Sequence, residues 1–84
     1  MSPADLALVL RRQGETVSLG GLAGLLSEAG VRIESVRVER GRAGSWSHWI
    51  ALLVPTTPTT WTGCEGSGAT IALALADACE RVAS

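Results

Sequence analysis

Residues 31–54 read VRIESVRVERGRAGSWSHWIALLV, and this stretch decides the fold. Its first ten residues are dense in β-branched side chains and alternate in polarity, which predicts a strand over residues 31–40. The alternation changes phase at Glu34 and Ser35, so this strand requires a β-bulge. Turn-forming residues follow at 41–45, and a second strand is predicted over residues 46–54. The two strands therefore form a hairpin.

The second strand is apolar on both faces from Trp49 onward. This pattern is typical of a central strand that is covered from both sides. Beyond Pro55 and Pro58 we expect a short third strand over residues 59–62, at an edge of the sheet because proline cannot donate a hydrogen bond. Residues 63–68 are rich in glycine and are expected to form a loop.

Helices are predicted before and after these strands, each from a serine cap and an apolar stripe at helical spacing. They run from Pro3 to a stop at Gly14, over residues 19–29 between Ser18 and Gly30, and over residues 68–83 after Ser67. The element order is then α-α-β-β-β-α. We therefore expect a single α+β domain, residues 1–84, with a small antiparallel sheet of about three strands packed against helices.

The composition limits the partners. The net charge of −1 gives no field that attracts nucleic acid or anionic lipid, and no apolar run reaches the roughly 18 residues of a membrane span. A chain of 84 residues that is 46% hydrophobic predicts some apolar surface covered by a partner or by a second copy, a homodimer.

The two cysteines bear on the compartment. Cys64 in a loop and Cys79 well inside the following helix would lie too far apart for a disulfide. Free thiols and an N-terminus without a basic leader predict a reducing, cytoplasmic location.

Catalytic motifs are incomplete. Residues 63–70, GCEGSGAT, fit the phosphate-loop pattern except at Ala69, where the pattern requires lysine, and the sequence contains no lysine. His48 is the only histidine, and no spacing suits a metal. We therefore expect a protein that is not an enzyme and has no cofactor. One alternative function is a small anionic-ligand binder at a helix N-terminus formed by Ser67, Gly68, Ala69 and Thr70.

Arginine and tryptophan, which are enriched at binding hot spots, gather in and near the hairpin. They predict a protein-binding surface made of Arg37, Arg40, Arg42, Trp46, His48, Trp49 and Trp61. Tryptophans equally thicken small cores, and that interpretation stays open.

A further alternative is a DNA-binding regulator. If residues 31–40 were helical, residues 19–40 would form a helix-turn-helix with its arginines facing DNA. The β-branched residues and the acidic net charge argue against nucleic acid as the partner.

From Trp46 onward the chain has an aromatic-rich strand, a loop, the run GSGAT at residues 66–70 and an alanine-rich helix containing Cys79. This pattern resembles the small phage ABA-sandwich domain proteins over residues 46–83, less than half of the chain. The resemblance implies a phage or prophage accessory protein with helices on a small sheet and no catalytic residues to carry over. Such proteins commonly bind a host protein, so it also implies an inhibitor of a host defence system, as anti-CRISPR proteins are.

Overall fold

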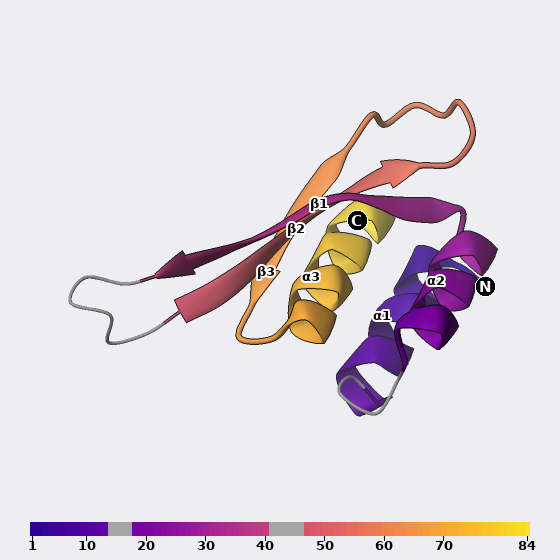
Figure 1. Ribbon diagram of the computed structural model, residues 1–84. Coiled ribbons are helices and arrows are strands. Elements are labelled where there is room, and N and C mark those ends of the chain that lie inside the picture. The colour runs from indigo at the N-terminus through magenta and orange to yellow at the C-terminus, as the bar shows by residue number, and fades with distance from the viewer. Residues whose placement is uncertain (14–17, 41–46) are drawn as a thin grey trace.

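The computed structural model describes residues 1–13, 18–40 and 47–84. Within them the order is α1 (Pro3–Gln13), α2 (Leu19–Glu28), β1 (Val31–Arg40), β2 (Ser47–Pro55), β3 (Cys64–Gly68) and α3 (Ile71–Ala83). The strands form an antiparallel sheet in the order β1-β2-β3, and the helices cover one of its faces (Figure 1). The predicted α+β class and element order are confirmed.

The predicted hairpin and its bulge are both present. β1 pairs with β2 from Val31 opposite Pro55 to Arg40 opposite Ser47, and the register shifts between Ile33 and Ser35. The extra residue restores the phase of the strand, so that apolar side chains before and after the bulge point to the same, helix-covered face. The predicted turn at residues 41–45 lies outside the described residues, as does the predicted helix stop at Gly14.

β2 is the central strand, as predicted, but it is not sandwiched between two layers. Ala51 and Leu53 are fully buried under the helices. Ile50 points to the opposite, helix-free face of the sheet and is still only 7% exposed. Both faces of β2 are therefore covered, but by different groups. The helices cover one face, and side chains of the neighbouring strands cover the other.

The third strand differs from the prediction. Residues 59–62 are not a strand, and the stretch expected to be a glycine loop contains β3. The reason is the contact of β3 with α3: a Cβ on Gly66 would lie 2.5 Å from the carbonyl oxygen of Ala74 and closer still to the amide of Ala78. Only a strand without a side chain at this position can approach the helix backbone so closely.

The last helix also begins later than predicted. Its N-cap is Thr70, whose hydroxyl accepts a hydrogen bond from the Leu73 amide at 3.2 Å, and the first helical residue is Ile71. Ser67, the predicted cap, belongs to β3 and pairs with Ile50. The two hydroxyl residues are three positions apart, and pairing with β2 decides which of them caps the helix. The Ser18 cap of α2 is confirmed by its hydrogen bond from the Gly21 amide at 3.0 Å.

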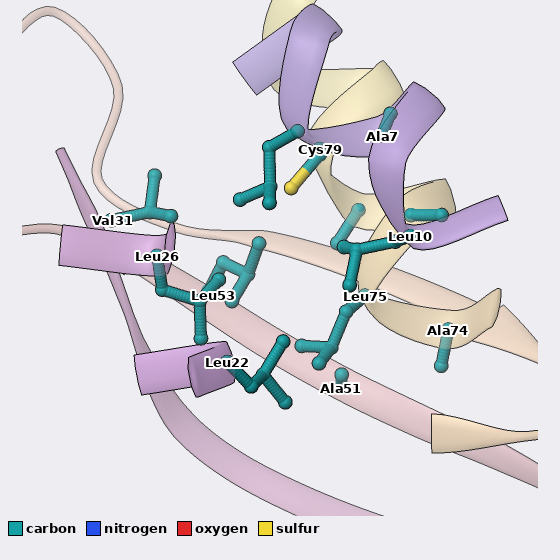
Figure 2. Packing of buried hydrophobic residues seen from close by; sticks show 13 residues of the cluster. Ala7, Leu10, Leu22, Leu26, Val31, Ala51, Leu53, Ala74, Leu75 and Cys79 are labelled. Atoms are coloured by element: carbon teal, nitrogen blue, oxygen red, sulfur yellow. The ribbon is translucent and has the colours of Figure 1, made fainter. Parts of the chain in front are cut away.

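The core lies between the helices and the sheet. α1 contributes Leu6 and Leu10 to it, and α3 contributes Leu75. Figure 2 shows Leu10 and Leu75 side by side in this core. On the sheet side, Leu53 of β2 closes the core. At the α2 end the core is completed by three residues that Figure 2 shows near Leu53, namely Leu22, Leu26 and Val31.

Both cysteines are free thiols, as predicted. The reason given for this was wrong in one respect, because Cys64 lies on β3, which runs beside α3, and not in a loop ahead of it. Burial raises the pKa of the Cys79 thiol to about 11 and also raises that of Cys64. Both thiols are therefore neutral and weakly nucleophilic near pH 7.

Replacing Gly66 with alanine should lower the free energy of unfolding by about 3 kcal/mol, because the methyl group overlaps the α3 backbone. The unfolding midpoint should fall by roughly 12–24 °C for a domain of this size. Gly24→Ala is the matched control. No atom lies within 4 Å of a Cβ there, so this helix substitution should stabilise by about 1 kcal/mol. An unchanged midpoint for Gly66→Ala, measured by circular dichroism, would contradict the close approach of β3 to α3.

Candidate protein-binding surface

β1 is an edge strand of the sheet (Figure 1). No other strand of the described residues pairs with the outer side of this strand, and all its residues from Glu34 to Arg40 are exposed. Val36 and Val38 point to the helix-covered face but remain 37% and 42% exposed, because the helices do not reach this end of the hairpin. A long edge strand with exposed valines is a template for pairing with another chain.

The opposite edge of the sheet is capped at Ser67. The Ser67 amide of β3 points outward and donates to Oδ2 of Asp77 on α3 at 2.9 Å. Arg81 donates to the same oxygen at 3.2 Å. The hydrogen bond from Ser67 is the main cause that lowers the pKa of Asp77, and Arg81 adds to it. The two edges are therefore different: one is covered by a charged side chain and the other is available.

The same hydrogen bond fixes which β1 groups face outward. Hydrogen-bonding direction alternates from residue to residue along an antiparallel strand. Since the amide of Ser67 points away from β2, its pair partner Ile50 directs its backbone groups toward β1 and thus toward Arg37. The backbone groups of Val36 and Val38 consequently point outward.

The other end of β1 follows the same rule. The Thr56 amide donates to the Gly30 carbonyl at 3.0 Å, so this carbonyl points toward β2. The backbone groups of the next residue, Val31, therefore point away from β2. Ile33, two residues further on, also faces outward. The outward backbone groups thus belong to the residues whose side chains lie on the helix-covered face.

A groove of about 340 Å³ lies between α2 and the first residues of β1. Its walls are mainly apolar and are formed by Leu22, Ala23, Leu26, Ser27, Val31, Arg32, Ile33 and Thr56. The groove runs beside the open edge, on the face toward which Val36 and Val38 also point. An added strand would therefore place alternate side chains next to it.

The helix-free face carries a network of charges over an apolar strip. Arg37 on β1 donates two hydrogen bonds across β2 to Glu65 on β3, at 3.2 and 3.4 Å. Arg37 also lies 3.8 Å from Glu39, whose other oxygen is 3.6 Å from Nε2 of His48. Arg37 is opposite Ile50 in the register, so its aliphatic stem shields that side chain while its charged end stays in water.

The predicted binding residues that the structure describes lie on different faces of the sheet. Arg37 and His48 lie on the helix-free face, whereas Trp49 faces the helices and packs against the core cluster. Trp61 precedes β3 and is also partly buried against that cluster. Arg40 is the exposed last residue of β1. Arg42 and Trp46 lie outside the described residues.

The geometry bears on the two alternative functions in different ways. The helix-turn-helix required a recognition helix over residues 31–40, and this prediction was wrong because these residues form β1. At the predicted anion site, two of the four residues already take part in hydrogen bonds. The Ser67 amide is bonded to the Asp77 carboxylate, the Thr70 hydroxyl holds the Leu73 amide, and Gly68 packs against Leu73. Ala69 lies between β3 and α3.

The sequence did not reveal the groove. The sequence predicts an apolar stripe on the helix over residues 19–29, but only the packing of α2 against β1 shows that part of this stripe, at Leu22 and Leu26, lines a groove. One signal was present: Val36 and Val38 alternate with charged residues in a strand that precedes a turn, as an exposed edge would.

In the described parts of the chain, no helix is both long and apolar enough to cross a bilayer, and no three metal-binding side chains gather. Comparisons with protein families, with curated proteins and with solved structures found no match for this chain. The resemblance to small phage ABA-sandwich proteins therefore stays a prediction.

Replacing Asp77 with alanine should lower stability by about 1–2 kcal/mol at pH 7, since a charge-assisted hydrogen bond to Ser67 is lost. The pKa of Asp77 is lower in the folded chain than its ordinary value of 3.8. The stabilisation is therefore complete above that value and is lost as the pH falls through the folded pKa. Urea unfolding should show the two proteins converging as the pH falls below the folded pKa of Asp77. Arg81→Ala, which leaves the Ser67 bond intact, should change stability much less; an equal loss would contradict this role of Asp77.

Proposed function

We propose that this chain is a non-enzymatic protein-binding module that takes up an extended segment of its partner along the outer edge of β1. The observation that supports this most directly is the difference between the two sheet edges. The β3 edge is covered by Asp77, whereas β1 offers the outward backbone groups of residues such as Val36 and Val38. Strand addition uses backbone hydrogen bonds for affinity and side-chain pockets for selectivity.

The groove between α2 and β1 supplies such a pocket. A partner strand that pairs with the first half of β1 directs every second side chain toward the helix-covered face, beside Ile33 and Leu26. Apolar partner side chains suit this position. The intervening partner side chains meet Arg32 and Glu34, which form an ion pair at 2.7 Å. The preferred partner segment is therefore extended, with apolar and charged residues in alternation.

The more specific form of the proposal takes a host protein or protein complex as the partner, as an anti-defence inhibitor of the anti-CRISPR kind would. It rests on the resemblance over residues 46–83 and on no contact of the fold. A pull-down from host lysate should then recover the same protein with the wild-type chain and lose it with Val38→Pro, the variant described below.

Val38→Pro should abolish strand addition and leave the fold intact. Proline removes an outward amide and fills the edge with its ring, but the β1–β2 hydrogen bonds come from residues such as Arg37 and are kept. For a peptide selected against the chain from a display library, the dissociation constant should rise at least tenfold, since about 1 kcal/mol is lost with the hydrogen bond and more with the blocked edge.

Val38→Thr is the matched control, because it keeps both the amide and the shape of the side chain and should bind the peptide nearly as tightly as the wild type. Isothermal titration gives the affinities, and thermal unfolding verifies that both variants fold. Equal binding by Val38→Pro and the wild type would disprove the proposal, as would peptide protection of β3 amides in hydrogen exchange with none in β1.

A further inference from the structure

β1 is complementary to a second copy of itself. On the helix-covered face it presents Val31, Ile33, Val36, Val38 and Arg40, and on the other face Arg32, Ser35, Arg37 and Glu39. Glu34 is the bulge residue, and its ion pair with Arg32 brings its charge to this second face. In an antiparallel pair, the side chains of residues directly opposite one another lie on the same face. Their backbone N–H and C=O groups either all point toward the other strand or all point away from it. The question is whether any register meets this condition over the whole strand.

One register meets it, with Val36 on the two-fold axis opposite the partner subunit's Val36. Because each strand has one bulge, the positions then match face by face. Val38 lies opposite the partner subunit's Ile33, and Glu39 lies opposite the partner subunit's Arg32. Arg37 meets the partner subunit's Glu34 at its bulge. On one face Val36 and Val38 meet apolar residues, and only Arg40 at the strand end lies opposite the partner subunit's Val31. On the other face opposite charges pair, which is favourable for cross-strand neighbours.

Other symmetric registers are poorer. Centring the pair on Arg37 or on Glu39 places like charges directly opposite each other, which is unfavourable. Centring it on Ser35 places Arg32 opposite the partner subunit's Arg37. Centring it on Val38 does match Arg37 with the partner subunit's Glu39, but it leaves residues 31–35 without strand residues opposite them.

In this register, the two valine side chains that are exposed in the single chain become covered. The exposed side chain of Val38 comes to lie beside the partner subunit's Ile33, at the mouth of the partner's groove between α2 and β1. The two-fold axis repeats this contact, so both grooves gain an apolar neighbour. Val36, 37% exposed in the single chain, is covered at the axis.

From this complementarity we infer that the strand added to β1 is the β1 of a second copy, giving a two-fold dimer with a continuous six-stranded sheet. The inference rests on the proposed strand addition and names its occupant. The helices of both copies then lie on one face of the joined sheet, and the outer edges of the dimer are the two β3 strands, each covered by Asp77.

Light scattering coupled to size exclusion tests the dimer directly. The wild-type chain should show twice its 8.7 kDa mass at micromolar concentrations. Val38→Pro should shift it to the monomer. Arg32→Glu and Glu39→Arg should each weaken the dimer about tenfold or more, because each creates two symmetry-related like-charge contacts. Arg12→Glu, a charge reversal of the same size on α1, should leave the dimer unchanged.

Mixing the two charge variants tests the register. A chain with Arg32→Glu carries two acidic residues at positions 32 and 39, and a chain with Glu39→Arg carries two basic ones. Both cross-strand pairs become attractive in the mixed dimer. Native mass spectrometry should therefore find the heterodimer in clear excess over both homodimers, with an affinity near that of the wild type.

Three results would overturn the inference: a wild-type chain that stays monomeric up to about 1 mM, a dimer that survives Val38→Pro, or charge variants that show no preference for each other. The proposed function fails separately. A monomeric chain that still binds the selected peptide, and loses it with Val38→Pro, keeps strand addition and rejects only the second copy as its occupant.

Discussion

The contact between β3 and α3 sets the position of everything else in the sheet. At Gly66 the strand backbone touches the helix backbone at Ala74 and Ala78, and at Gly68 it touches Leu73. Small residues on both sides permit this approach, which explains both the glycines of β3 and the alanines of the helix. Since β2 pairs with β3 and β1 with β2, the whole sheet is oriented from this one contact.

That orientation also decides which surfaces are covered. α3 lies over β3 and β2, α1 packs on α3, and α2 touches β1 only near its start. The far half of β1 is left without a helix, and a groove remains where α2 and β1 diverge. The uncovered valines and the groove are thus consequences of helix placement and not of a local feature of β1.

Local signals in the sequence were sufficient for much of this fold. The alternation of residues 31–40 gave the strand, and its change of phase at Glu34 gave the bulge. Failure came where a distant contact overrode local preference. Residues 64–68 look like a loop because glycine disfavours strands, yet the backbone contact with Ala74 requires glycine there. The proposed binding edge could be predicted only in part for the same reason: arginines and tryptophans can be read from the sequence, whereas an edge left open by the packing of α2 cannot.

The carboxylate of Asp77 has a consequence for the size of any assembly. A sheet with two available edges can grow without limit, as fibrils do, because every added strand exposes a new edge. Here each molecule contributes one available edge and one that is sealed. Association between copies through their β1 edges would therefore end at the pair, and a change that frees the β3 edge would let such a pair add further copies.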